Sequence, residues 1–484
     1  MCGIYLLYNS ELTILPNFLQ NLKKIQHRGH DSYGVIARIN KSLLPSLRFF
    51  QNGKIIIPEV INSCEKYNIF LGHLRYKTSG LHSENGGQPI FTKNKLGSFH
   101  FVFNGNIPCS EYPGNYTLDT TMIKEFLEKD EHINSWGELL QSFVNTFKRA
   151  YSIIIVTDTD KVFLLKDCYG VRPLCFSYSE SNQTLEVASE SVGISLKNHD
   201  KITEVNPGEI LEFDLANINV PKVIYKEKEL ENLYGGKCIF EYIYFLNSET
   251  TWNNLPVEKI RNEWAKSLAK TDLEWINSVD KNNYIVIGIP STGVQPGQAY
   301  AKELELNYIQ GITKNAKVNR TFILAESERD KVSKKKYIYN KELIQGKHVI
   351  IIDDSIVRGV TMRNLVHSIF DNGALGVHIR IISPTITDIC KYGIDIPTKE
   401  ELIANKMSIP QMNDYFGASS LKFLEIDLLM KTIEPFINKS TICSGCFGGG
   451  YNDIDIEDLV VNKQKETPQN ILNYQNIETK CIIS

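Results

Sequence analysis

The segment that most constrains the fold is the run of thirteen residues from Val349 to Thr361. Its first four residues are branched and apolar, two aspartates (Asp353 and Asp354) follow, and a short loop leads to a helical pattern near Thr361. Such an apolar run is typical of a strand buried on both faces, as in a parallel sheet. Carboxylates at its end can hold hydroxyl groups and Mg²⁺, and the following helix N-terminus can bind a phosphate. Two helix-capping acids are the simpler alternative, but they leave most of the run unexplained.

The sequence around this run alternates between helical and extended patterns. Alternation of this kind predicts a parallel α/β sheet covered by helices. Beyond residue 256 we expect helices at 257–278, 296–304 and 361–372, and strands at 284–289, 347–352 and 377–382.

The first 225 residues show a different pattern, in which short apolar segments are separated by Gly, Asn or Asp turns. This spacing predicts packed, mostly antiparallel sheets with helices on their outer faces. Two such different patterns in a chain of 484 residues indicate two or three domains. We expect strands at 69–71, 99–103, 152–156, 162–165, 185–188 and 209–213, and helices at 12–27 and 119–150.

Charge and composition exclude several classes of partner. The chain carries 53 basic and 56 acidic residues, so its near-zero net charge gives no electrostatic reason to expect nucleic acid or a membrane surface as a partner. No apolar run approaches the roughly 18 residues of a membrane helix, and the start of the chain lacks the basic stretch of a secretory signal. We therefore expect a cytoplasmic protein whose ten scattered cysteines are thiols, catalytic groups or metal ligands.

The first cysteine follows the initiator methionine directly, and Gly3 comes next. Cysteine is small enough for the methionine to be removed, which would give Cys2 a free α-amino group with a pKa of about 7.7–8.0. A nucleophilic thiolate and its base would then belong to one residue. A chance Met-Cys start is the ordinary explanation when this feature is taken alone.

Four further segments follow Cys2 in order: Gln26–Gly29, Gly72–Gly80, Asn104–Asn106 and Asp119. In this order and spacing they resemble the glutamine amidotransferases of the N-terminal-nucleophile hydrolase class. Any one segment would be weak support, whereas the ordered set is specific.

The resemblance implies a role for each matching residue. Cys2 would be the nucleophile, and the Asn104 side chain and the Gly105 N–H would stabilise the oxyanion of the tetrahedral intermediate. Arg75, Thr78 and Asp119 would bind glutamine, with the Arg75 guanidinium on its α-carboxylate. Taken singly, Arg75 could be a structural ion pair and Asn104–Gly105 a hairpin turn.

The run at 349–361 resembles the diphosphate-sugar motif of type I phosphoribosyltransferases. This resemblance implies Mg²⁺ at Thr292, Asp353 and Asp354. The family's flexible loop is altered at 316–319, which bears on coupling between sites more than on the substrate. The residues implied for phosphoribosyl pyrophosphate are Lys314, Arg320, Lys336, Asp353, Asp354, Ser355, Arg358, Gly359 and Thr361.

Both halves together resemble the amidophosphoribosyltransferases over nearly the whole chain. The implied fold is an α+β N-terminal-nucleophile hydrolase domain with four αββα layers (2–235), then an α/β type I phosphoribosyltransferase domain (236–452) and a tail (453–484). The implied reaction converts glutamine and phosphoribosyl pyrophosphate to 5-phosphoribosylamine, which opens purine biosynthesis, with ammonia passed between two sites. The resemblance also implies purine nucleotide effectors and a homotetramer or homodimer. Glucosamine-phosphate or asparagine synthase would share only the first half, and a non-catalytic phosphoribosyl-pyrophosphate-binding protein would fit the altered loop.

Four cysteines match the iron–sulfur branch of this family: Cys238, Cys390, Cys443 and Cys446. The resemblance implies a [4Fe–4S] cluster, which needs four thiolates. Zinc on the same four thiolates is the main alternative. We expect most of the remaining cysteines, at positions 64, 109, 168, 175 and 481, to be buried small apolar residues.

Overall fold

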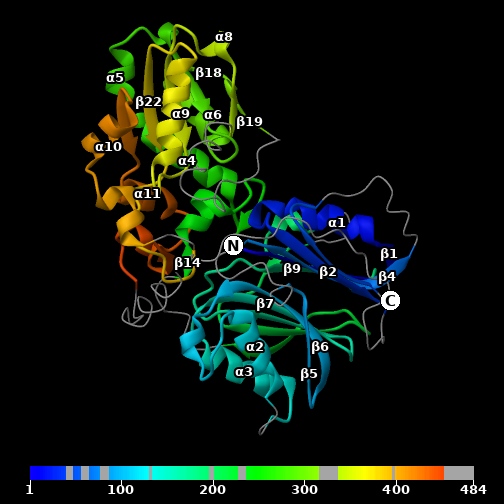
Figure 1. Ribbon diagram of the computed structural model, residues 1–484. Helices are drawn as coiled ribbons and strands as arrows, with labels where there is room; N and C mark the ends of the chain where they lie inside the picture. The colour runs from blue at the N-terminus through cyan, green and yellow to red at the C-terminus, as the bar shows by residue number, and fades with distance from the viewer. Residues whose placement is uncertain are drawn as a thin grey trace, which may run out of the picture. The chain divides into compact units, whose positions relative to one another are not determined.

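A computed structural model describes residues 1–39, 47–55, 65–76, 87–129, 133–195, 201–226, 236–315, 336–394 and 398–451 (Figure 1). The chain divides into two compact units. The first unit is Met1–Lys237 together with Lys391–Ile394 and Tyr451–Ser484, and the second is Cys238–Cys390 with Asp395–Gly450. A four-residue segment from late in the sequence therefore belongs to the first unit.

Two antiparallel sheets build the described part of the first unit, as its short, turn-separated segments predict. In spatial order, the first sheet contains β11 (Thr203–Glu204), β9 (Cys175–Ser179), β10 (Thr184–Ala188), β1 (Gly3–Ile14), β4 (Lys66–Arg75), β2 (Ser32–Arg38) and β3 (Leu47–Asn52). The second contains β13 (Lys222–Lys226), β12 (Glu209–Asp214), β8 (Lys161–Lys166), β7 (Ala150–Thr157), β6 (Gly97–Asn106) and β5 (Ile90–Asn94).

Strand periodicity explains why these sheets form the middle layers of a sandwich. Along β1, Ile4 and Leu6 point into a core shared with residues of the second sheet, such as Val102 and Ile154. Tyr5 alternates to the opposite face and packs in the cluster that includes α1 (Leu15–Lys24). The outer face of the second sheet packs against α2 (Asp119–Glu128) and α3 (Trp136–Thr146) (Figure 1). The predicted αββα arrangement is confirmed.

The second unit contains the parallel sheet that the alternating pattern predicts. Its spatial order is β18 (Asn307–Tyr308), β17 (Tyr284–Gly288), β21 (His348–Asp353), β22 (Gly376–Ile381) and β23 (Ser420–Phe423), and every pair is parallel. The α-helices in its described part are α4 (Val257–Lys270), α5 (Leu273–Asn277), α6 (Val294–Leu304), α8 (Lys341–Ile344), α9 (Val360–Asp371), α10 (Ile409–Phe416) and α11 (Ile426–Ile433). Short pairs join β14 (Lys237–Cys238) to β24 (Ile442–Cys443), β15 (Thr251–Trp252) to β16 (Leu255–Pro256), and β19 (Ile312–Lys314) to β20 (Tyr337–Tyr339).

Three expected helices are wrong in extent. The helix expected at 12–27 begins at Leu15, because Thr13 and Ile14 still pair with β4 and Pro16 starts the helix. The helix expected at 119–150 is two helices, and Ser135 caps the second by accepting from the Glu138 N–H. Ala150, the last residue of the expected helix, is instead the first residue of β7.

The third expected helix, 257–278, is interrupted between α4 and α5, where Asp272 accepts hydrogen bonds from buried side chains of other elements. The Asp272 carboxylate is fully buried, and the Arg380 guanidinium donates to both of its oxygens. Tyr300 and Lys422 also donate to it, at 2.5 and 2.7 Å. This network ties α4, α6, β22 and β23 together.

In the portion of the chain that is described, none of the helices is both long enough and apolar enough to cross a membrane.

Candidate active sites

Cys2 lies immediately before β1, at the end of the first sheet. Because Gly3 pairs with Leu74, the start of β1 lies beside the end of β4, where Arg75 is located. The Cys2 backbone N–H donates to Oδ1 of Asn104 at 3.1 Å, and its carbonyl accepts from Nε of Arg28 at 3.1 Å. The two ends of the Cys2 backbone are thus held by side chains from different segments.

Asn104 and Gly105 lie near the end of β6, opposite Ser152 and Tyr151 of β7. Asn104 is only 1% exposed, and its Nδ2 has no hydrogen-bond partner among the described residues. Because Oδ1 is occupied by the Cys2 N–H, the amide is oriented with a donor to spare beside the thiol-bearing residue. A Cβ on Gly105 would lie 2.6 Å from the Ala150 carbonyl oxygen, so this position has no room for a side chain.

Asp119 is the first residue of α2, and its carboxylate accepts the Thr120 N–H at 2.7 Å. Burial raises the pKa of Asp119 to about 7, a Cys2 thiolate would raise it further, and the Thr120 N–H and Arg75 oppose the shift. The interactions place the Asp119 carboxyl within electrostatic reach of Cys2 and Arg75. The pKa of Asp119 therefore depends on its burial, on the charge of Cys2 and on the nearby Arg75 cation. Thr78, predicted to bind glutamine, lies outside the described residues.

Sequence reasoning gave no role to a buried ion-pair cluster next to Cys2. Nη1 of Arg28 donates to Glu190 at 2.6 Å, and Nε2 of His27 lies 2.7 Å from the same oxygen. Although burial opposes it, His27 and Arg28 hold the pKa of Glu190 well below its usual range. The cluster fixes Arg28 while its Nε holds the Cys2 carbonyl. The motif Gln26–Gly29 contains His27 and Arg28, and the segment Ala188–Ser191, which also resembles the family, contains Glu190; neither indicated that the two pair.

The second candidate site is at the carboxyl end of the parallel sheet. Asp353 ends β21, Asp354 follows, and the loop leads to Gly359 and α9, as the run at 349–361 predicts. Oδ1 of Asp354 accepts from the Ser355 hydroxyl at 2.6 Å, and Oδ2 accepts from the Thr292 hydroxyl. Burial raises the pKa of both aspartates, and the charge of Asp354 raises that of Asp353 further.

Strand β17 supplies the neighbouring loop, and Thr292 comes from it. The Ile289 N–H donates to the Ile352 carbonyl at 2.8 Å, so the loop after β17 begins beside the end of β21. The peptide bond between Pro290 and Ser291 is cis. Lys314, at the end of β19, donates to the Ser291 hydroxyl at 3.0 Å.

The remaining predicted phosphoribosyl residues are distributed around this end of the sheet. Lys336 is close enough to lower the pKa of both aspartates, against the larger effect of burial. Arg358 pairs with Glu401 at 2.6 Å, and Thr361 is exposed in the first turn of α9. Gly359 has a φ of +81°, and a Cβ there would lie 2.5 Å from Ile403, so the turn requires glycine. Arg320 and the altered loop at 316–319 lie outside the described residues.

The four cysteines singled out by sequence converge within the second unit. Cys238 is on β14 and Cys443 on β24, which pair with each other. The Cys446 carbonyl accepts the N–H groups of Thr387 and Asp388, shortly before Cys390. Burial raises the pKa of Cys446 well above its usual value, and the charges of the other three cysteines add to this. As they stand, no three His, Cys, Asp or Glu side chains in the described ranges are arranged to hold a metal ion.

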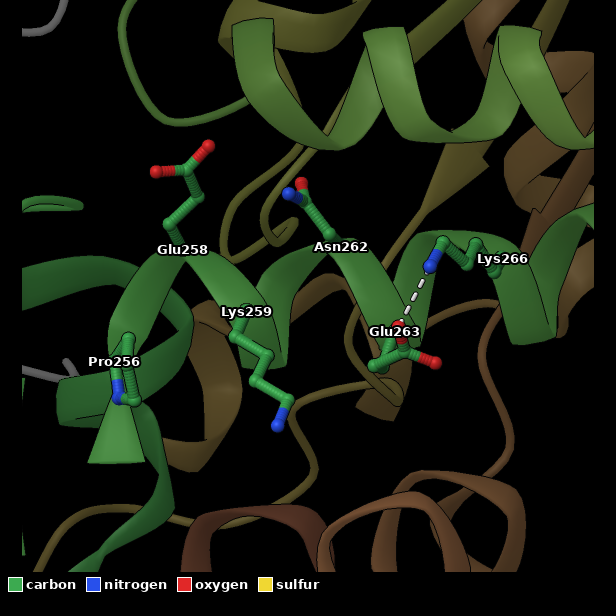
Figure 2. Close-up of a pocket in the computed structure, with 6 residues that line it drawn as sticks. All are labelled: Pro256, Glu258, Lys259, Asn262, Glu263 and Lys266. Carbon is green, nitrogen blue, oxygen red and sulfur yellow. Dashed lines mark hydrogen bonds and ion pairs between the residues drawn. The ribbon is translucent and has the colours of Figure 1, made fainter. Parts of the chain in front are cut away.

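Neither candidate site coincides with a depression of about 330 Å³ along α4 (Figure 2). Its lining side chains include Glu258 and Lys259, and Glu263 pairs with Lys266 at 2.7 Å. It contains no nucleophile and none of the predicted catalytic or binding residues.

The comparisons with known proteins agree with both sites. A glutamine amidotransferase domain family matches residues 73–195, and a phosphoribosyl transferase domain family matches residues 257–383. The amidophosphoribosyltransferase of Archaeoglobus fulgidus is 30% identical over 473 residues, which covers 93% of this chain and 98% of the relative. The chain belongs to the amidophosphoribosyltransferase family.

Solved structures extend the likeness to both units. The glutamine phosphoribosylpyrophosphate amidotransferase of B. subtilis, in complex with ADP and GMP, superposes with a TM-score of 0.76 at 27% identity, covering 93% of this chain and 97% of that one. A structure described as the allosteric regulatory enzyme of purine biosynthesis superposes with a TM-score of 0.79 at 27% identity, covering 96% and 99%.

The predicted function is thereby confirmed. As an amidophosphoribosyltransferase, the protein uses glutamine to aminate phosphoribosyl pyrophosphate to 5-phosphoribosylamine in purine biosynthesis. The rival synthases are excluded by the transferase half, which forms the second unit and matches its own domain family.

Proposed function

We propose that glutamine is hydrolysed at Cys2 after removal of Met1. The α-amino group takes the proton of the thiol, and the thiolate attacks the amide carbon. The α-ammonium group then returns this proton to the nitrogen as the tetrahedral intermediate expels ammonia, and water hydrolyses the glutamyl thioester to glutamate and the free thiol. The observation that carries this proposal is the orientation of Asn104. Its Oδ1 holds the Cys2 N–H, and its Nδ2, which has no partner among the described residues, can donate to the developing oxyanion together with the Gly105 N–H.

The glutamine substrate would be held by the charges next to Cys2. Arg75 suits the α-carboxylate by paired hydrogen bonds, Asp119 suits the α-ammonium, and Thr78 completes the set. A bound ammonium group would favour the ionised form of Asp119, whose pKa is about 7 in the empty site.

A covalent label tests the glutaminase site. A diazoketone analogue of glutamine should attach to Cys2 of a chain that begins at that residue, and excess glutamine should prevent the reaction. Peptide mapping by mass spectrometry locates the label and the first residue. Attachment to Cys109, or a labelled chain that still begins with Met1, would contradict the proposal.

We propose that phosphoribosyl pyrophosphate binds at the carboxyl end of the parallel sheet. Asp353 and Asp354 would hold the ribose hydroxyls, and the loop from Ser355 through Gly359 to Thr361 would hold the 5′-phosphate. Lys314, Arg320, Lys336 and Arg358 would neutralise phosphate charge. Thr292, Asp353 and Asp354 supply the oxygen ligands that Mg²⁺ prefers, and a bound Mg²⁺ would stabilise the departing pyrophosphate.

The wider organisation is proposed as follows. Residues 2–235 form the glutaminase domain, 236–452 the transferase domain and 453–484 a tail. Ammonia passes to C1 of the sugar, where it displaces pyrophosphate. The nucleotides in the B. subtilis complex support purine nucleotides as effectors. We further propose a cytoplasmic homotetramer or homodimer with no nucleic-acid or membrane partner.

We propose that Cys238, Cys390, Cys443 and Cys446 hold a [4Fe–4S] cluster. Four thiols in one region, two of them buried and two half-buried, with Cys446 influenced by the other three, are a donor set that suits iron–sulfur clusters and zinc. The cluster would be structural, because neither half-reaction transfers electrons.

Metal analysis distinguishes the two metals. Anaerobically purified protein should be brown and contain iron and acid-labile sulfide in equal amounts, as the composition of the cluster requires. The Cys446→Ser variant should lose both, while Cys109→Ser, which changes a half-buried cysteine of the first unit, should keep them. Colourless protein that contains only zinc would exclude the cluster.

A further inference from the structure

Lys391–Ile394 interrupts the second unit and belongs to the first. The chain leaves the second unit at Cys390 and rejoins it at Asp395. Within the first unit its contacts include the end of β6, the loop after β8 and Tyr451.

Gly393 packs directly against the last residue of β6. Its φ is +81°, and a Cβ at this position would lie 2.2 Å from Cβ and 2.8 Å from Cγ of Asn106. Asn106 directly follows Gly105 and is two residues beyond Asn104. A side chain at position 393 would therefore have to displace Asn106, on the strand that carries the proposed oxyanion donors.

Tyr392 is linked to Asn104 indirectly, through Arg172 and Ser152. Its carbonyl accepts a hydrogen bond from Nη2 of Arg172, whose side chain is buried. The Arg172 carbonyl accepts from the Ser152 hydroxyl at 3.2 Å, and Ser152 is paired with Asn104 across the sheet.

The loop after β8, which contains Arg172, also contacts both Tyr392 and β7. The Tyr392 ring packs on Tyr169, with centroids 5.5 Å apart. Asp167 accepts the Tyr169 N–H at 2.9 Å and the Tyr151 N–H at 3.2 Å, and Tyr151 is the cross-strand partner of Gly105. Both strand partners of the oxyanion residues thus connect through this loop to the inserted segment.

We propose that Tyr392 and Gly393 are positioning residues for glutamine hydrolysis, which set the oxyanion donors through Arg172 and Asn106. This proposal rests on the oxyanion roles proposed above for Asn104 and Gly105. Oxyanion donors act over a narrow range of distances, so a displacement of about 1 Å can cost on the order of 10²-fold in rate.

The Gly393→Ala variant tests this role, because its new Cβ must push Asn106 away. We expect the kcat of glutamine hydrolysis to fall about 10- to 100-fold, with the KM for glutamine changed less than about threefold, since neither Arg75 nor Asp119 is displaced. Ammonia-dependent formation of 5-phosphoribosylamine should be unchanged. Alkylation of Cys2 by iodoacetamide should also be unchanged, because displacement of iodide by the thiolate creates no oxyanion.

Two matched variants distinguish the effect of displacing Asn106 from the effect of backbone strain at a positive φ. Gly53→Ala, also in the first unit, has a comparable φ of +86° with no atom within 4 Å of the new Cβ, so its kcat should stay close to that of the unaltered protein. In the double variant Gly393→Ala with Asn106→Gly, the clashing Cβ is removed and kcat should recover to within a few fold.

The outcomes identify which proposal fails. If Asn104→Ala leaves the kcat of glutamine hydrolysis unchanged, the oxyanion assignment itself is wrong. If Asn104→Ala lowers kcat about 10²- to 10³-fold while Gly393→Ala lowers it less than twofold, only the positioning role is wrong. Equal losses in kcat, Cys2 alkylation and the ammonia reaction would show general disruption and also overturn it. Should Gly393→Ala not fold, Arg172→Met, which removes the donor to the Tyr392 carbonyl, must give the same selective loss of kcat.

Discussion

The Cys2→Ala variant is expected to lose glutamine-dependent formation of 5-phosphoribosylamine by on the order of 10⁴-fold or more, while ammonia-dependent formation remains. Without the thiol no glutamyl thioester can form, and the Asn104 and Gly105 donors have no oxyanion to stabilise. Ammonia supplied at alkaline pH bypasses this step, because the transferase site lies on separate elements, β17, β21 and α9. Release of pyrophosphate with each nitrogen source measures the two rates.

The control for this variant is Cys109→Ala, which removes a half-buried thiol of the same unit that has no proposed role. It should retain both activities. If Cys2→Ala kept the glutamine reaction, or if Cys109→Ala lost it selectively, the nucleophile would have to be another residue.

The Asp353→Asn and Asp354→Asn variants are expected to lose the glutamine-dependent and ammonia-dependent reactions alike, by about 10²- to 10³-fold, because both need phosphoribosyl pyrophosphate. The free energy of unfolding of both variants, by contrast, should increase. Burial and mutual repulsion raise the pKa values of these carboxyls, so a neutral amide relieves a cost of folding in the empty protein. Calorimetric titration with the substrate, pyrophosphate release and thermal unfolding together measure these effects.

Asp371→Asn provides the matched control, because Asp371 is exposed at the end of the helix that follows the site. This change should alter neither reaction and neither substrate affinity. A loss of substrate binding in the control, or full activity in Asp353→Asn, would show that the carboxylates do not hold the sugar.

Local patterns predicted the parts of both sites that are built from adjacent residues. The run at 349–361 forms a strand, a loop and a helix because its apolar residues, acids and glycine act over neighbouring positions. Alternation of apolar residues likewise predicted the sheets of both units, since each strand buries one or both faces. The ordered motifs around Cys2 and Asn104 identified residues that the fold brings together from 102 positions apart.

Features that depend on distant partners were beyond such reasoning. The break between α4 and α5 arises because Asp272 binds Arg380, 108 residues away. Glu190 binds Arg28 across 162 residues, and nothing in the local sequence around either residue indicates this pairing. The segment Lys391–Ile394 gave no periodic or compositional signal that it belongs to the first unit.

That segment also bears on how such an enzyme can be divided or recombined. A fragment ending at Lys237 would retain Cys2, Arg75, Asn104 and Asp119 but would lack the backbone that packs on Asn106. Grafting the first half onto a different acceptor domain would leave the same gap. The glutaminase of this chain is therefore not an interchangeable module, and recombination at the boundary would have to bring along a short stretch encoded about 150 residues downstream.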